Sequence, residues 1–81
     1  MDAEIAVAKA YEILNDPKRS EKDKINLLLW VDAQIYQNIG IESSKNYKEK
    51  SRRASAVIYR LIKTLDHDKG QRFLTALGLS K

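Results

Sequence analysis

Residues 44–65, SKNYKEKSRRASAVIYRLIKTL, limit what this chain can fold into, because their apolar side chains recur at helical spacing. Small or apolar residues alternate steps of four and three, which keeps them on one side of a helix with 3.6 residues per turn. They are Tyr47, Ser51, Ala54, Ile58, Leu61 and Leu65, and Val57 and Ile62 widen the stripe. The spacing predicts one long amphipathic helix over 44–65, with Ser43 or Ser44 as its N-cap.

The opposite side of this helix is predicted to be basic. At 100° per residue, that side gathers Lys48, Arg52, Arg53, Tyr59, Arg60 and Lys63. Cations next to a tyrosine ring could contact phosphates while the ring stacks on a base. The same side chains also fit a solvated helix face, with Glu49 and Arg53 as an i, i+4 pair. We therefore treat these six residues as a candidate face for an anionic partner, with a solvated surface as the alternative.

Charge is distributed unevenly along the chain. The net charge is +4, but residues 1–40 hold five Lys/Arg against seven Asp/Glu, a net −2, whereas residues 41–81 hold ten against four, a net +6. This asymmetry favours an anionic partner, which could be nucleic acid, an acidic protein or a lipid surface. The alternative is an ordinary highly charged, soluble helical protein in which the imbalance is incidental.

Length and composition predict a single cytoplasmic domain over residues 1–81. A chain of this size buries only about 60% of its unfolded surface, so its stability should be marginal. The sequence has no cysteine, which excludes disulfides and thiolate metal sites. The longest apolar run, 27–31, is far shorter than the roughly 20 residues of a transmembrane helix, and the acidic N-terminus does not resemble a secretory signal.

Three further helices are expected. The first runs from about Ala3 to Leu14, with Asp2 as its cap and an apolar face of Val7, Ala10, Tyr11 and Leu14. It stops at Asn15-Asp16-Pro17, since the residue before proline disfavours the α conformation. The second begins after Ser20 and reaches about Asn38. A short fourth follows a turn over 66–70, with Asp66 or Asp68 as its N-cap. The predicted class is all-α: a small up-and-down helical bundle of three main helices plus a short C-terminal fourth.

The stretch AYEILNDPKR, Ala10 to Arg19, resembles the end of the third helix of J domains and the turn that follows it. The match covers ten residues, and the His-Pro-Asp tripeptide of that family is absent from the sequence. The resemblance therefore implies a shared way to end a helix, and no function is carried over.

Asp32 is a buried polar candidate, because it falls inside the apolar arc of the second helix. An isolated carboxylate there is costly unless it is paired. One interpretation is a structural pair with an Arg or a Tyr hydroxyl from another helix, or a position at the wet rim of the core. The other is a polar group that fixes helix register or binds a ligand.

Trp30, Ile5 and Leu27 are candidate interface residues, since they lie off the principal apolar faces. Trp30 shares its side of the second helix with Asn26 and Gln34. Either the first helix or the C-terminal segment covers its indole, or the indole is exposed and marks an interface, where tryptophan is enriched. A second copy of the chain could cover such residues in a homodimer.

The sequence carries no recognisable catalytic motif. His67 is the only histidine, so metal sites that need several nitrogen or sulfur ligands are not expected. The loop from Asp66 does not follow the calcium-loop pattern, because Gly70 is at its fifth position and Leu77 is at its twelfth. We therefore expect a non-enzyme with no cofactor, no metal and no small-molecule substrate. The first prediction is a small adaptor or inhibitor that binds a protein or itself; the alternative is a nucleic-acid-binding accessory protein that uses the basic side of 44–65.

Overall fold

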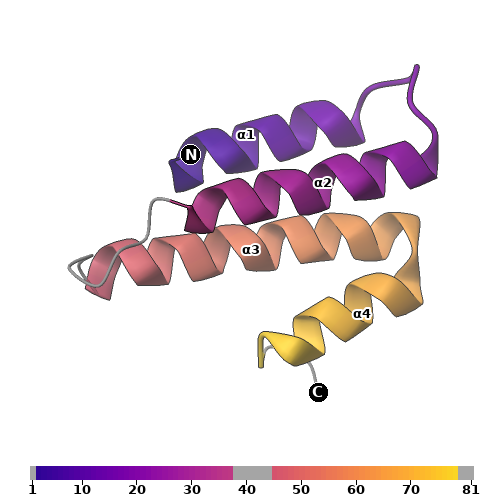
Figure 1. The fold of residues 1–81 in the computed structure, drawn as a ribbon. Coiled ribbons are helices and arrows are strands. Elements are labelled where there is room, and N and C mark those ends of the chain that lie inside the picture. Colours follow the sequence, from indigo (N-terminus) through magenta and orange to yellow (C-terminus); the bar gives the residue numbers. More distant parts are fainter. Residues whose placement is uncertain (1, 38–44, 79–81) are drawn as a thin grey trace.

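The computed structural model describes residues 2–37 and 45–78, which fold into four α-helices (Figure 1). The helices are α1 (Ala3–Leu14), α2 (Glu21–Tyr36), α3 (Lys45–Leu65) and α4 (His67–Ala76). No strand occurs in these two ranges, so the all-α class is confirmed. The expected N-caps Ser43 and Ser44 lie outside the described residues.

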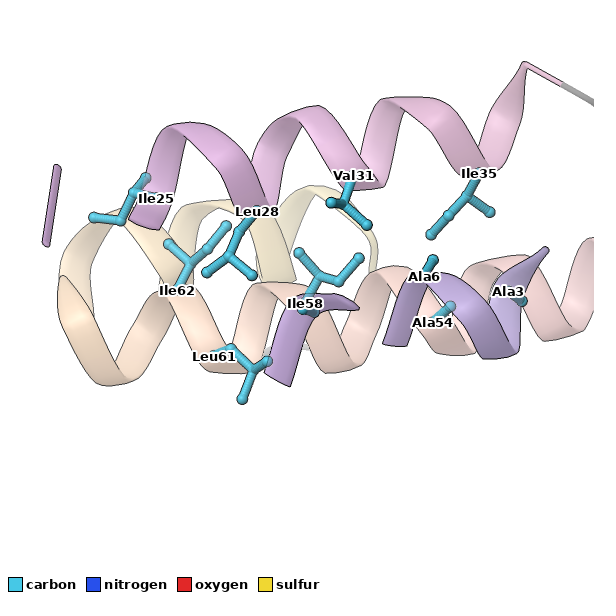
Figure 2. Close-up of a cluster of buried hydrophobic side chains, with 11 residues drawn as sticks. Ala3, Ala6, Ile25, Leu28, Val31, Ile35, Ala54, Ile58, Leu61 and Ile62 are labelled. Carbon is cyan, nitrogen blue, oxygen red and sulfur yellow. The ribbon is translucent and has the colours of Figure 1, made fainter. Parts of the chain in front are cut away.

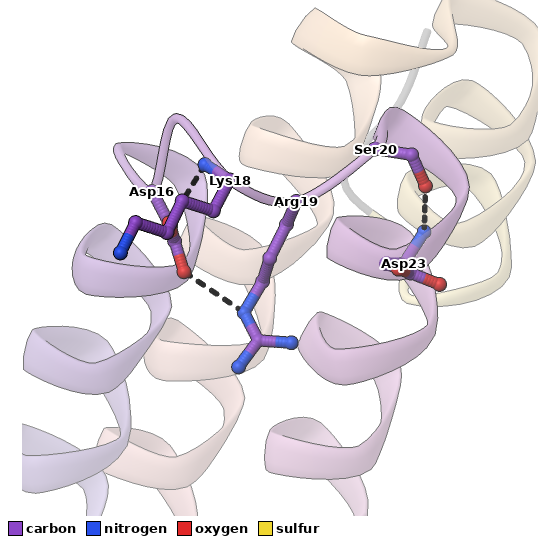
Figure 3. Close-up of polar contacts among 5 residues, drawn as sticks. All are labelled: Asp16, Lys18, Arg19, Ser20 and Asp23. Carbon is purple, nitrogen blue, oxygen red and sulfur yellow. Dashed lines mark hydrogen bonds and ion pairs between the residues drawn. The ribbon is translucent and has the colours of Figure 1, made fainter.

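Local side-chain contacts begin the first two helices and hold the turn between them. Asp2 Oδ1 accepts a hydrogen bond from the Glu4 amide at 2.8 Å, which caps α1. In the connector, Asp16 accepts from the Lys18 amide at 2.9 Å and pairs with Arg19 at 3.1 Å (Figure 3). Ser20 Oγ accepts from the Asp23 amide at 3.2 Å and caps α2, as the sequence predicts.

The first three helices pack on one another, and among the described residues α4 packs on α3 alone. The Cα atoms extend over 39 × 29 × 14 Å, so the molecule is flat. A flat shape leaves a thin core, and several large apolar side chains remain partly in contact with solvent.

The hydrophobic core lies between α1, α2 and α3. Figure 2 shows Leu28 of α2 and Ile62 of α3 pointing toward one another between their helices. The largest fully buried apolar side chains come from α2 and α3: Leu28, Val31, Ile35, Ile58 and Ile62. The apolar stripe predicted for 44–65 is thus part of this core, with Ser51, Ala54, Ile58 and Leu61 buried.

The first helix contributes small side chains to the core. Its buried residues are Ala3, Ala6 and Ala10, while Val7 and Leu14 are half-buried. The expected inner face was therefore wrong at Tyr11, which is 47% exposed. The three alanines lie on one side of α1 and face the core, and the larger tyrosine lies outside this contact.

The fourth helix begins directly after Asp66, one of its two expected N-caps. Asp66 Oδ1 accepts from the Lys69 amide at 3.1 Å, so Asp66 is the cap and α4 starts at His67. Within the predicted turn over 66–70, residues 67–70 therefore form the first turn of α4. Gly70 is buried where α4 crosses α3, and a Cβ added there would overlap the backbone of Lys63. The close approach of α4 thus depends on glycine at this position.

Replacing Gly70 with alanine tests this contact, because helix propensity and steric overlap predict opposite changes in the free energy of unfolding. Helix propensity alone predicts that Gly70→Ala stabilises the protein by about 1 kcal/mol. Overlap with the backbone of Lys63 predicts a loss of about 1–3 kcal/mol instead. We expect a lower free energy of unfolding for Gly70→Ala in chemical denaturation. The control is Arg72→Ala, on the exposed side of α4, which should change this free energy by only a few tenths of a kcal/mol. A Gly70→Ala protein more stable than the wild type would contradict the packing described here.

Candidate functional site

A buried hydrogen-bond cluster joins α2 to α3 around Asp32. Asp32 is 9% exposed. Its Oδ1 accepts from the Ser55 hydroxyl at 2.5 Å, and its Oδ2 accepts from the Tyr59 hydroxyl at 2.7 Å. Tyr36 Oη lies 2.5 Å from Ser55 Oγ, and since Ser55 gives its only hydrogen to Asp32, Tyr36 must be the donor there. We call these four residues the Asp32 network.

The Asp32 network accounts for a carboxylate in the interior of a small domain. Each carboxylate oxygen accepts one hydrogen bond from a hydroxyl, which offsets part of the desolvation cost. Of the interpretations left open by the sequence, the geometry matches a structural pair with a Tyr hydroxyl from another helix. Ser55 and Tyr59 are one helical turn apart on α3, so both oxygens of the carboxylate find their donors on one side of that helix. A role of Asp32 in fixing helix register stays a prediction.

Tyr59 connects this network to α4. Its ring stacks on Phe73 with centroids 5.1 Å apart and an interplanar angle of 21°. Burial, followed by the hydrogen bond and charge of Asp32, raises the pKa of Tyr59 well above its ordinary value of 10.0. The phenol therefore stays protonated and continues to donate to Asp32 in mildly alkaline solution.

Part of the basic side predicted for 44–65 is covered by α4, so the six residues do not form one open face. The Tyr59 ring stacks on Phe73 and its hydroxyl donates to Asp32, so the half-buried ring is less accessible to a base than an exposed tyrosine. Lys63 is half-buried against Gly70. Arg52 Nη2 donates to the Leu77 carbonyl at 2.7 Å, at the end of α4. An amphipathic pattern does not reveal that a second helix will cover the polar side.

Most cations of the predicted face are exposed. Lys48, Arg52, Arg53 and Arg60 are in contact with solvent, and Arg52 also bonds to the Leu77 carbonyl. Arg53 Nη2 lies 3.7 Å from Glu49 Oε2, and both side chains are more than half exposed. An exposed i, i+4 pair contributes only a few tenths of a kcal/mol, so Arg53 can readily leave Glu49 for the carboxylate of a partner.

An open groove between α1 and α3 is the best candidate site. It encloses about 360 Å³ and is lined by Ala3, Glu4, Val7, Lys50, Arg53, Ala54 and Val57. The floor consists of aliphatic side chains from both helices, and charged side chains stand at its rim. We call this feature the α1–α3 groove. A second hollow of about 370 Å³ lies over α3 and shares Arg53 and Val57 with the groove.

A larger cleft lies between the start of α2 and the turn into α4. It encloses about 500 Å³ and is lined by Glu21, Lys22, Ile25, Asn26, Leu65, Asp66 and Lys69. Its two carboxylates and two ammonium groups balance, so the cleft does not favour a partner of either sign. We regard it as the weaker candidate for this reason.

The candidate interface residues have different environments. Trp30 is 53% exposed and Ile5 is 54% exposed, whereas Leu27 is half-buried. The described part of the chain thus leaves the indole largely uncovered, which is the second of the two expected arrangements. Whether a partner contacts these residues stays a prediction.

Side chains of the types that bind metal ions are dispersed in residues 2–37 and 45–78. No cluster of three or more His, Cys, Asp or Glu side chains there could hold a metal ion. His67 Nδ1 lies 3.7 Å from Asp68 Oδ1 on the surface. Within the same ranges, no helix has the length and apolar character needed to cross a membrane.

Comparisons with protein-family models, with curated proteins and with solved structures find no match to this chain. Any function proposed for this chain therefore rests on the residues of the groove.

Sequence reasoning did not find Ser55 or Tyr36 as members of the Asp32 network. Ser55 lies one helical turn before Tyr59, and this spacing is a signal that could have identified Ser55 as a second hydroxyl donor.

The raised pKa of Tyr59 predicts a pH dependence of stability that Tyr59→Phe should remove. In the unfolded chain the phenol ionises near pH 10.0, whereas in the folded protein it remains neutral to higher pH. The stabilisation linked to the neutral phenol is thus present below pH 10 and is lost as the pH rises through the folded pKa.

We expect the difference in unfolding free energy between wild type and Tyr59→Phe to be constant from pH 7 to 9 and to shrink above about pH 10. Denaturant titrations at each pH measure it, and Tyr11→Phe, at an exposed tyrosine, serves as the control. A difference that does not change above pH 10 would mean that Tyr59 ionises equally in both states.

Proposed function

We propose that this chain is a non-catalytic interaction protein, an adaptor or inhibitor that folds as an up-and-down helical bundle and binds a macromolecular partner. The observation that carries the proposal is the α1–α3 groove, an aliphatic floor open to solvent beside exposed cations. Apolar contact would supply affinity, and the charged rim would orient the partner.

The chemistry of the groove favours binding over catalysis. Its polar groups are one carboxylate, from Glu4, and the cations of Lys50 and Arg53. A nucleophile with an adjacent base, the arrangement that activates a side chain for attack, is not among the groove's lining residues. The remaining lining residues are Ala and Val, which pack against a partner but do not transfer protons.

A second copy of the chain is one partner that would suit the groove. A domain this flat has marginal stability, and self-association would bury the aliphatic floor. In this form of the proposal the protein is a homodimer.

Nucleic acid is the second candidate partner. The net +6 of residues 41–81 and the exposed cations Lys48, Arg53 and Arg60 support phosphate contacts. The arrangement gives less support than the sequence suggests, because the half-buried Tyr59 ring stacks on Phe73. Any binding of this kind should depend on charge more than on base stacking.

Site-specific photo-crosslinking tests the first proposal. With photoreactive p-benzoylphenylalanine in place of Lys50, at the rim of the groove, irradiation in extract of the native host should give one discrete adduct. The same replacement at Lys9, an exposed position of α1 outside the groove, should not. Adduct masses distinguish a self-adduct, which indicates a homodimer, from a different protein. Equal labelling at both positions, or none at Lys50, contradicts the proposal.

The nucleic-acid alternative is tested by measuring binding to DNA or RNA over a range of salt concentrations. Binding to mixed-sequence DNA or RNA that weakens steeply as salt rises would support it, since phosphate contacts release counterions. Undetectable binding at low salt would exclude it.

A further inference from the structure

Other helices occupy three sides of α3, and no helix in residues 2–37 or 45–78 covers the fourth side, which we call the open side. Ala54 borders the groove with α1, Ser55 bonds to Asp32 of α2, and Lys63 abuts Gly70 of α4. These positions, at 100° per residue, leave uncovered the side of α3 that carries Arg53 and Arg60. The open side therefore lies between α1 and α4, opposite α2.

The shape of this open side suits a helix. The α1–α3 groove and the second hollow lie on either side of Arg53 and Val57, which both hollows share. Side chains spaced three and four residues apart on a partner helix could enter both hollows, as ridges enter grooves in helix packing. Lys50 and Arg60 are ten residues apart, so the open side is about 15 Å long, or roughly three helical turns.

An extended peptide suits it less well. Its backbone amides and carbonyls would need partners, and the walls here are helices whose backbone groups bond internally. A strand edge, which binds extended peptides by adding a strand, does not occur in residues 2–37 and 45–78. A helix satisfies its own backbone and requires only side-chain contacts.

The charge at the rim selects an acidic partner. Lys50, Arg53 and Arg60 are exposed along the open side, against the carboxylates of Glu4 and Glu49. These three positive and two negative charges give the open side a net charge of +1. Arg52 also borders the second hollow and raises the net charge to +2. Arg53 and Arg60 are seven residues apart, or about two helical turns.

From these observations, and resting on the proposed function, we infer that the partner segment is an acidic amphipathic helix that lies on the open side of α3. Its apolar residues would contact Val7, Ala54 and Val57 in the α1–α3 groove. Its carboxylates, spaced about two turns apart, would pair with Arg53 and Arg60, and another would pair with Lys50.

Model peptides test the inference without knowledge of the natural partner. The probe is a fluorescein-labelled, end-capped helix of about 14 residues, built from Ala, Leu and Glu with Leu at i, i+3 and i+7 and Glu on the flanks. A second peptide has Lys in place of every Glu. We expect the acidic peptide to bind at least about tenfold more tightly in fluorescence anisotropy, and backbone NMR shifts should map to α1 and α3 around Val57.

A charge-reversed protein provides the decisive comparison. Lys50→Glu with Arg53→Glu should reverse the preference, so that the Lys peptide binds better than the Glu peptide. The matched control, Lys9→Glu with Lys18→Glu, makes the same change in net charge at exposed positions outside the groove and should preserve the preference for the acidic peptide. Because all four positions are exposed, the variants should remain folded, and circular dichroism verifies this.

Three outcomes would overturn the inference. The first is a preference that the Lys50 and Arg53 reversal does not change. The second is full displacement of the acidic peptide by an equal charge concentration of single-stranded DNA or of anionic vesicles. The third is a Lys50 crosslink to a partner segment that is not acidic and helical, which would leave the proposed function standing. Absence of any adduct at Lys50 overturns the proposed function itself, whatever the peptides show.

Discussion

The arrangement of helices around α3 depends on the hydrogen bonds of one buried carboxylate, that of Asp32. Hydroxyl donors within hydrogen-bond distance offset its desolvation, and Ser55 and Tyr59 supply them from one turn of α3. This contact holds α2 against that side of α3. Because the Tyr59 ring also stacks on Phe73, the same cluster extends to α4. A single polar group thus links the positions of two helices on α3.

With α2 and α4 placed in this way, the candidate binding surface lies on the other two sides of α3. On the third side, α1 packs through alanines, which brings it close enough to form a shallow aliphatic groove with Ala54 and Val57. The fourth side retains exposed cations, including Arg53 and Arg60. An apolar floor beside positive charge is the basis of the proposed binding of a macromolecular partner and of the inference that an acidic helix occupies the groove.

Local features of this fold could be predicted from the sequence, and contacts between distant segments could not. The caps Asp2 and Ser20 and the stripe in 44–65 depend on residues close together in the chain. Periodicity identified Asp32 as a polar residue on an apolar face, but not the hydroxyls that bond to it. It also indicated a basic side of α3 without showing that α4 covers part of it, because that contact depends on Gly70, a single residue without a side chain.

The most direct test of this account is a double-mutant cycle between Asp32 and Tyr59. Unfolding free energies of wild type, Asp32→Ala, Tyr59→Phe and the double variant give their coupling energy. A hydrogen bond to a buried carboxylate predicts a coupling of about 1.5–3 kcal/mol. Tyr11→Phe, combined with Asp32→Ala, should give additive effects. Additivity between Asp32 and Tyr59 within about 0.5 kcal/mol would contradict the claim that this contact orders the helices around α3.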